Sequence, residues 1–270
     1  NFKDVLIALG VIPSPEDKSM TFGQEASGVI TRLGSGVTHF KVGDRVMAAG
    51  HSCFAEHVLM PASVVAKIPP TIGYTQAATI PVAFTTAWIA LVKTANLKRG
   101  ERILIHSAAS GVGMAAMQIA QYLGAEVWAT AGTEEKHQLL LRMGAKGVAT
   151  SRSREFGQYF RAELGERPFD VVLNALAGEL LEESLDLLAC QGRFVELGLR
   201  DILDNKQLGL KMFAAGGSFH AVQAGAEHPE YAASWKEVVE NFEQEQFHGL
   251  PTKAFPLDEL GIAFEEMAQG

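Results

Sequence analysis

The sequence predicts an α/β protein with a doubly wound parallel sheet and a second, β-rich domain. Three observations predict this class. An apolar strand at 103–105 enters a tight turn of small residues, and the turn opens directly onto a helix. Strands and helices then alternate through residues 126–197, a pattern typical of a parallel sheet with helices on both faces. Glycines divide residues 1–82 into short β-type runs.

The N-terminal residues predict a small, twisted β domain. Its strands are expected at 26–31, 44–48 and 54–60, with glycines at the turns between them. A helical stretch at 76–91 follows and leads into the parallel sheet. This change of texture, from short glycine-punctuated runs to long apolar helices, indicates two domains.

The helices and strands after the glycine turn predict the rest of the parallel sheet. The helix at 112–123 ends at Gly124, which suits the residue after a helix, and Thr133 is expected to cap the following helix, which ends at Gly144. The strands are expected at 126–131, 147–150, 170–176 and 193–197. Two amphipathic helices are expected near the C-terminus, at 234–246 and 255–267.

We expect the last helix to return to the first domain. The β-rich domain is therefore placed at 1–82 plus 248–270, and the parallel-sheet domain at 83–247. The active cleft is expected between the two domains, because ligand sites commonly form at domain interfaces.

The turn after the first strand of the parallel sheet suits a pyrophosphate. Unpaired N–H groups and the helix dipole both favour an anion at a helix N-terminus. Ala108 and Ser110 stand at the first two glycine positions of the dinucleotide fingerprint, and Gly113 keeps the third. An ordinary strand-to-helix turn can look similar, but the alternation that follows favours a Rossmann nucleotide site. The expected cofactor-binding residues of the turn are Ala109, Ser110, Gly111, Val112, Gly113 and Met114.

The end of the second strand favours NADPH over NADH. An NAD site usually has a carboxylate there for the ribose hydroxyl, but Thr130 and Gly132 flank a neutral strand end. Lys136 lies just beyond it, and Ser151 and Arg152 follow the next strand. Two cations near a neutral strand end fit a 2′-phosphate. The alternative is that both are ordinary solvated surface cations.

Composition narrows the classes of function. The chain has 270 residues and a formal net charge of −8, which argues against nucleic acid or an anionic membrane as the main partner. Its uninterrupted apolar stretches are shorter than a membrane span. The two cysteines form no spacing motif, so a reducing cytoplasm is the expected setting. No Gly-x-Ser-x-Gly elbow supports hydrolase chemistry.

Several segments resemble one family. Residues 1–10, 23–28, 42–46 and 54–56 resemble the GroES-like substrate domain of medium-chain dehydrogenase/reductases, in their zinc-free quinone-reductase-like branch. More narrowly, three segments resemble the enoyl reductase domains of type I modular polyketide synthases and animal fatty acid synthases: 105–116, 172–179 and 193–203. That family has further strands at both ends of the β-rich domain. We therefore expect an incomplete domain, excised from a larger polypeptide.

The resemblance implies a reaction and its partners. NADPH would deliver hydride to the β-carbon of an α,β-unsaturated acyl thioester, which an acyl carrier protein presents within a megasynthase. Thr85, Asn174, Leu197 and Gly198 would lie near the nicotinamide, although packing at a strand end explains Leu197 nearly as well. The residues expected to face the cleft are Asn1, Asp4 and Gln24, of which Asp4 is also explained as a structural hydrogen-bond acceptor. Oligomeric state stays open, with strand pairing near 218–222 suggested by analogy alone.

No metal site is expected. Zinc-dependent relatives have Gly-His-Glu where this chain has Gly23-Gln24-Glu25, and they carry a cysteine-rich lobe that is absent here. Glutamine is a poor zinc ligand. His51, Cys53 and His57 lie close together in sequence, but an ordinary strand with a partly exposed histidine explains them better.

The resemblance also exposes missing proton donors. Ile12, Leu199 and Gln223 stand where relatives carry Tyr, Lys and Asp. None of the three is an effective acid at neutral pH, and the adjacent Arg200 stays protonated. Three interpretations stay open. Water or another group protonates the enolate in an ordinary reduction; or the enolate displaces a γ-leaving group and forms a cyclopropane; or the domain is a non-catalytic part of a megasynthase.

Overall fold

The computed structural model describes residues 1–11 and 22–269, and these form two compact units. The first unit comprises Asn1–Thr85 with Gly225–Gly270, and the second comprises Thr86–Ala224. The segment 225–247, which we expected in the nucleotide-binding domain, clusters with the first unit. The reason is aromatic packing, since the Phe242 ring lies 4.8 Å from that of Phe84 and 5.8 Å from that of Phe247.

The second unit contains the predicted parallel sheet. Its six strands are hydrogen-bonded in the order β6-β5-β4-β7-β8-β9, and all pairs are parallel. The chain therefore starts in the middle, moves outward to one edge, and returns past β4 to build the other half. This order is that of a Rossmann fold. The strands are β4 (Arg102–Ile105), β5 (Glu126–Ala131), β6 (Val148–Thr150), β7 (Phe169–Asn174), β8 (Leu188–Glu196) and β9 (Ser218–Ala221).

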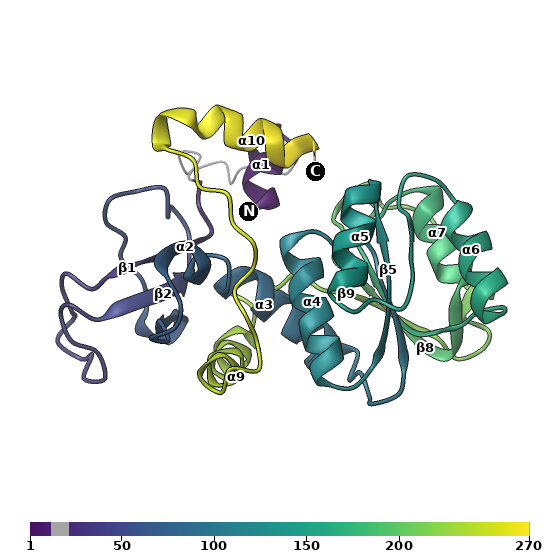
Figure 1. The fold of residues 1–270 in the computed structure, drawn as a ribbon, viewed down its shortest axis with the longest axis horizontal. Helices are drawn as coiled ribbons and strands as arrows, with labels where there is room; N and C mark the ends of the chain where they lie inside the picture. The colour runs from purple at the N-terminus through teal and green to yellow at the C-terminus, as the bar shows by residue number, and fades with distance from the viewer. Residues whose placement is uncertain (12–21, 270) are drawn as a thin grey trace. The chain divides into compact units, whose positions relative to one another are not determined.

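Helices cover both faces of this sheet. Figure 1 shows α4 and α5 on one side of the strands and α6 and α7 on the other. Thr133 caps α5 by accepting a hydrogen bond from the Lys136 N–H at 3.4 Å, as the sequence predicted. The helices of this unit that follow β4 are α4 (Gly111–Tyr122), α5 (Glu134–Arg142), α6 (Glu155–Leu164), α7 (Glu179–Asp186), α8 (Arg200–Leu203) and the short 3₁₀ turn η3 (Leu210–Phe213).

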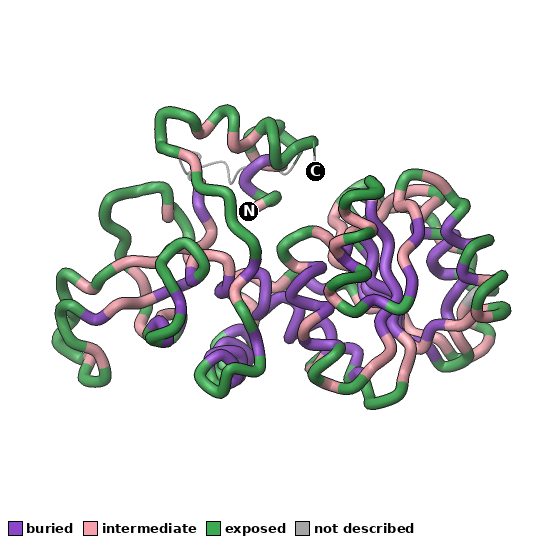
Figure 2. The backbone as a smooth tube through the Cα atoms, in the orientation of Figure 1, coloured by how far each residue is buried: buried purple, intermediate pink, exposed green. Residues whose placement is uncertain are grey.

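The core of the second unit lies on both faces of the strands, which are buried along most of their length (Figure 2). Leu104, Trp128, Val172 and Phe194 occupy one row of register partners across β5, β4, β7 and β8. This row packs in one cluster with aromatic and leucine side chains of α6 and α7. Alternation of side chains along each strand sends the next row to the opposite face.

The first unit contains a small antiparallel sheet. β1 (Glu25–Val29) pairs with β2 (Arg45–Ala49), which pairs with β3 (Val65–Lys67). The strand expected at 54–60 does not form, because this exposed segment has no partner strand among the described residues and an unpaired strand leaves its backbone groups unsatisfied. The other elements that begin in this unit are α1 (Phe2–Ala8), η1 (Ala62–Val64), α2 (Tyr74–Ala77), α3 (Pro81–Trp88), α9 (Tyr231–Glu243), η4 (Leu257–Glu259) and α10 (Leu260–Gln269).

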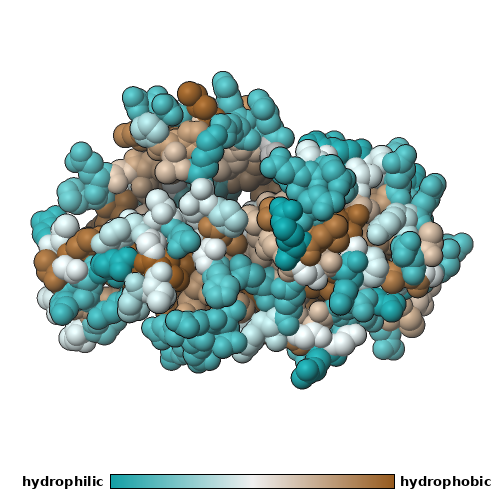
Figure 3. Space-filling model, in the orientation of Figure 1, coloured by the Kyte–Doolittle hydropathy of each residue, from teal (hydrophilic) through white to brown (hydrophobic). Residues whose placement is uncertain are grey.

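The apolar helical stretch between the units is a core element. Residues Tyr74–Thr94, which end in the π-helix η2 (Ile89–Thr94), have a mean hydropathy of 1.3 in their most apolar window, and 61% of that window is buried. Within the described part of the chain it is the one helix that reaches membrane-spanning length. Figure 3 shows hydrophilic groups over much of the visible face of the parallel-sheet unit with an apolar patch among them, and further apolar patches near β1 and β2.

Candidate functional site

The candidate site of the second unit lies at the carboxyl ends of its central strands. β4 and β7 are neighbours in the sheet. The strands β5 and β6 are added on one side of β4, and the strands from β7 onward are added on its other side, so the order of the strands reverses between β4 and β7. In open α/β sheets, ligands bind outside the carboxyl ends of the strands at this reversal. The predicted turn follows β4, and Asn174 is the last residue of β7, so the fold places both at this edge.

The turn after β4 has the features that a pyrophosphate requires. Ser110 is the N-cap of α4, and its hydroxyl accepts the Gly113 N–H at 3.1 Å. Gly111 and Val112 open the helix, where N–H groups have no intrahelical acceptor. A side chain at Gly113 would place its Cβ 2.6 Å from the Ala108 Cα and carbonyl oxygen. Only glycine therefore lets the turn pack this closely, and the turn fits a phosphate group.

The end of β5 brings two predicted residues together. A Cβ at Gly132 would lie 2.7 Å from the Arg152 Nε, so the guanidinium extends across the end of the strand. The Ser151 N–H donates to the Ala131 carbonyl oxygen at 2.9 Å and holds this segment in place. Arg152 is exposed, and Lys136 in the first turn of α5 is partly exposed. Neither side chain forms an ion pair among the residues that the structure describes. Two cations without ion-pair partners in the described part of the chain lie beside this strand end, and charges of this sign could attract an anion.

The sequence did not mark the buried histidine that directly follows β4. His106 is 3% exposed, and its Nδ1 and Nε2 lie 2.9 Å from the Thr130 and Ser184 hydroxyls. Ser184 donates its own proton to the Leu180 carbonyl oxygen at 2.6 Å, so it accepts from Nε2 and Thr130 donates to Nδ1. Burial lowers the pKa of His106 to about 3. Thr130, predicted to bind cofactor, therefore has its hydroxyl committed to a neutral imidazole.

A second buried cluster joins the ends of β7 and β8. Asn174 is fully buried and Glu196 is 2% exposed. The Asn174 Nδ2 donates to the Glu196 Oε2 at 2.6 Å and to the Leu176 carbonyl oxygen at 2.8 Å. The Glu196 Oε1 accepts the Gly198 N–H at 2.6 Å. Burial raises the pKa of Glu196 to about 7. Glu196 was missed because a lone glutamate in a strand is ordinarily solvent-exposed.

The predicted nicotinamide-end residues follow these strand ends. The Leu197 N–H donates to the Asn174 carbonyl oxygen at 2.9 Å, and Gly198 is held by Glu196. Leu199 is the N-cap of α8 and is partly buried, whereas Gln223, just after β9, is exposed. β8 and β9 are adjacent parallel strands, so the two substituted donor positions lie on one edge of the sheet. Ile12 lies outside the described residues.

Three of the predicted cleft residues come together in the first unit. The buried Asp4 accepts the Gly23 N–H at 2.9 Å through Oδ1, and the Gln24 side-chain amide lies 3.4 Å from the same oxygen. The Asn1 side chain donates to the Glu25 Oε1 at 2.8 Å. In these contacts Asp4 acts as a structural hydrogen-bond acceptor. Thr85, predicted near the nicotinamide, is fully buried in α3.

Glu25 is another residue that the sequence analysis passed over. Its Oε2 accepts the Val82 N–H at 2.9 Å, in the first turn of α3. A carboxylate in this place complements the helix dipole and satisfies a free N–H group. Burial is the main cause that raises the pKa of Glu25. Glu25 thereby fixes the start of the helix that carries Thr85.

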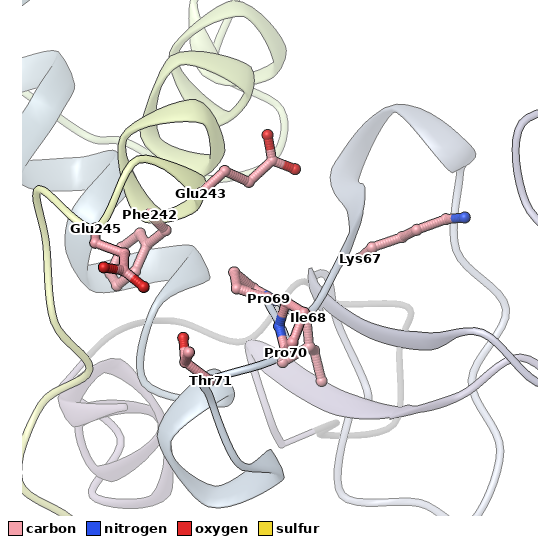
Figure 4. A pocket seen from close by; sticks show the side chains of 8 residues that line it. All are labelled: Lys67, Ile68, Pro69, Pro70, Thr71, Phe242, Glu243 and Glu245. Carbon is pink, nitrogen blue, oxygen red and sulfur yellow. The ribbon is translucent and has the colours of Figure 1, made fainter.

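Other clusters in the first unit show no cofactor chemistry. Within the described residues, no three His, Cys, Asp or Glu side chains are placed to hold a metal ion. A groove of about 490 Å³ lies between residues 67–71 and the end of α9 (Figure 4). Its lining contains Lys67, Phe242 and Glu243 and none of the predicted site residues.

Family models match most of the chain. Residues 1–70 match the alcohol dehydrogenase GroES-like domain, and residues 111–242 match the zinc-binding dehydrogenase family. Among curated proteins, a phenolphthiocerol/phthiocerol polyketide synthase polypeptide of Mycobacterium tuberculosis is 39% identical over 274 residues, which is 100% of this chain and 12% of the relative. The chain therefore spans a small part of the length of the synthases that it resembles.

Solved structures narrow the class further. The CurK enoyl reductase has a TM-score of 0.87 and 34% identity, and the match covers 100% of this chain and 84% of that one. The CurF ER cyclopropanase from curacin A biosynthesis has a TM-score of 0.89 and 30% identity with the same coverages. A mycobacterial protein complexed with NADPH has a TM-score of 0.86 and 26% identity, covering 100% and 85%.

The fold and the glycine turn define a two-domain dehydrogenase/reductase with a Rossmann-type nucleotide site. The chain belongs to the medium-chain dehydrogenase/reductase superfamily and, within it, to the enoyl reductase domains of polyketide synthases.

Proposed function

We propose that the chain reduces an α,β-unsaturated acyl thioester with NADPH, adding hydride to the β-carbon. The observation that carries the proposal is the anion site at the end of β5, where Arg152 extends across Gly132 beside Lys136. A ribose carboxylate partner is absent from this strand end, and the free cations complement a 2′-phosphate. The NADPH complex of the mycobacterial neighbour agrees with this choice.

The chain's own residues would bind and orient the dinucleotide. When bound, the reduced nicotinamide supplies the hydride. The turn 109–114 would hold the pyrophosphate, and the loop 197–199 would support the nicotinamide half together with Thr85. Asn1, Asp4 and Gln24 would form part of the substrate side, in the first unit, which we infer to contain the substrate domain (1–82 plus 248–270).

The substrate would arrive on an acyl carrier protein. The curated relatives are large polyketide synthase polypeptides, of which the chain matches about an eighth, so its partners would be the other domains of a cytoplasmic megasynthase. A thioester on a carrier protein can reach the enoyl reductase while the acyl chain stays attached to the assembly. Acyl carrier protein is therefore the partner that we propose.

Cyclopropane formation is the second candidate. Two acidic side chains near the carboxyl ends of β7 and β8 are engaged in hydrogen bonds, Glu196 by Asn174 and Gly198, and Asp201 by the Gly178 N–H at 2.6 Å. Leu199 and Gln223 supply no acid. An enolate formed here from a γ-chloro substrate would attack its own γ-carbon through the α-carbon, closing the ring as chloride leaves. A cyclopropanase is among the structural neighbours, and this similarity supports cyclopropane formation as the second candidate.

Two substrates test the proposal. Purified protein is mixed with NADPH and a crotonyl thioester, and oxidation is followed by absorbance while the product is identified by mass. Saturated thioester with stoichiometric NADPH oxidation is expected. A γ-chloro enoyl thioester then separates the two candidates, because reduction keeps the chlorine and cyclopropanation releases it. Absence of NADPH oxidation with either substrate identifies a non-catalytic domain.

A further inference from the structure

The loops that follow β7, β8 and β9 meet at one buried pair, Asn174 and Glu196. Backbone bonds already tie these loops to the pair, since the Leu197 N–H donates to the Asn174 carbonyl oxygen and the Val222 N–H donates to the Glu196 carbonyl oxygen, both at 2.9 Å. The side chains add a second set of bonds. Asn174 donates to Glu196 at 2.6 Å, and Glu196 accepts the Gly198 N–H at 2.6 Å.

Every polar atom of the two side chains is used inside the protein. Both Asn174 Nδ2 protons have acceptors, and its Oδ1 accepts the Leu176 N–H at 3.2 Å. Each Glu196 oxygen receives one N–H donor. An ionised carboxylate accepts from both N–H donors, whereas protonation turns one of its two oxygens into a donor and weakens it as an acceptor. The pair therefore holds a titratable carboxyl group in a place that is 2% exposed.

We propose that Glu196 is a positioning residue, which shapes the loop Leu197–Leu199 for the nicotinamide half of the dinucleotide by holding the Gly198 N–H inward. A Cβ at Gly198 would lie 2.7 Å from the Glu196 Oε1, so loop and carboxylate are in direct contact. The role rests on the proposed function for its ligand. Asn174, fully buried, acts through Glu196 and not by touching the dinucleotide.

The groups around the carboxylate explain why it responds to pH. Burial is the main cause that raises the pKa of Glu196 to about 7, and the negative charge of Asp201 in α8 adds to it. β7 contributes the neutral Asn174, and the segment after β9 contributes the Val222 backbone N–H. Protonation removes one of the two acceptors. The loop is therefore expected to loosen as the pH falls below neutrality.

The variant Glu196→Gln tests the proposal. A glutamine keeps the size and an acceptor for Gly198, but its NH₂ group faces the Asn174 NH₂ group. Amide hydrogen exchange of the cofactor-free protein is expected to rise on the order of ten-fold at 197–199. The KM for NADPH is expected to rise by a similar factor, on the order of ten-fold, with a smaller change in kcat.

Glu101→Gln is the matched control. Glu101 pairs with Arg193 in β8 at 2.6 and 2.9 Å, beside the amino ends of the strands. This variant is expected to lose stability without faster exchange at 197–199. A role of Glu196 in stability alone predicts that both variants lose unfolding free energy and that neither raises the KM for NADPH, and that result would overturn the proposal. Unchanged exchange in Glu196→Gln would overturn it as well.

Wild-type protein supplies a measurement that does not depend on the variant folding. Affinity for NADH, which has no 2′-phosphate to titrate, is measured from about pH 8 to about pH 6. Weaker binding toward pH 6 supports the proposal, and pH-independent binding overturns it. A wild type that binds neither dinucleotide at any pH overturns the proposed function, whereas the exchange comparison still decides the role of Glu196.

Discussion

At the residue scale, the proposed preference for NADPH over NADH depends on the Arg152 guanidinium. It lies against Gly132 at the end of β5 and has no ion-pair partner among the described residues. We expect Arg152→Gln to raise the KM for NADPH on the order of ten-fold and to leave that for NADH nearly unchanged, because one charge-assisted bond to a phosphate is lost.

Steady-state kinetics with both cofactors check this expectation. Arg142→Gln is the control, since Arg142 is exposed in the last turn of α5, away from the helix end that carries Lys136. Equal effects of Arg152→Gln on both cofactors would contradict a 2′-phosphate site.

Gly113, also at the residue scale, has no room for a side chain. A Cβ there would approach backbone atoms of Ser107 and Ala108 to 2.6 Å, and backbone has little room to yield. We expect Gly113→Ala to destabilise the protein by about 1–3 kcal/mol and to weaken dinucleotide binding, measured by chemical unfolding and fluorescence titration. Gly261→Ala in α10 is the counterpart with open space around the new methyl group. It is expected to be neutral or slightly stabilising, and a loss in both variants would refute the steric argument.

At the scale of elements, two buried titratable groups join the carboxyl ends of the strands with opposite effects of pH. His106 links β4, β5 and α7, and its pKa is lowered from 6.5 to about 3. The unfolded chain then binds the extra proton between these values, so stability falls as the pH drops from 6.5. Glu196 links β7 and β8, and its pKa is raised from 4.5 to about 7. There the folded chain binds the extra proton, so stability falls as the pH rises from 4.5 to 7.

Variants of the two residues separate these effects. On acidification from about pH 7 to about pH 5, Glu196→Gln is expected to lose unfolding free energy more steeply than wild type, and His106→Gln less steeply. One proton contributes at most about 1.4 kcal/mol per pH unit. Urea unfolding at a series of pH values measures the slopes. Parallel slopes in all three proteins would show that neither group titrates as its burial predicts.

At the scale of the whole molecule, most residues of the proposed dinucleotide site belong to the second unit, and Thr85 is the last residue of the first segment of the other unit. The glycine turn, Arg152 and the Glu196 cluster all lie within Thr86–Ala224. Saturation with NADPH at about 100 times its dissociation constant is expected to stabilise the native state by about 2.7 kcal/mol. Hydrogen exchange is expected to slow mainly within 86–224. Protection that is equal or greater in the β-rich unit would show that the dinucleotide is held elsewhere.

Local patterns in the sequence determined much of this fold. The glycine turn, the Thr133 cap and the β5 strand follow from neighbouring residues, and the structure confirms the Rossmann sheet with its β-rich companion. Short-range preferences suffice there, because a helix cap or an apolar strand is recognisable within a few residues. The proposed anion site is also predicted by the sequence, since Lys136 and Arg152 follow adjacent strands.

Only the tertiary structure decided which polar residues are committed inside the protein. The pairs His106 with Thr130 and Asn174 with Glu196 join residues at least 22 positions apart, and no local pattern marks such partners. The tertiary structure also decided that residues 54–60 do not form a strand, because a β-type run becomes a strand only when it pairs with another. The sequence by itself determined the class of fold and the glycine turn that we propose for the pyrophosphate. The parallel sheet, by setting strand ends side by side, determined which buried charge faces which donor.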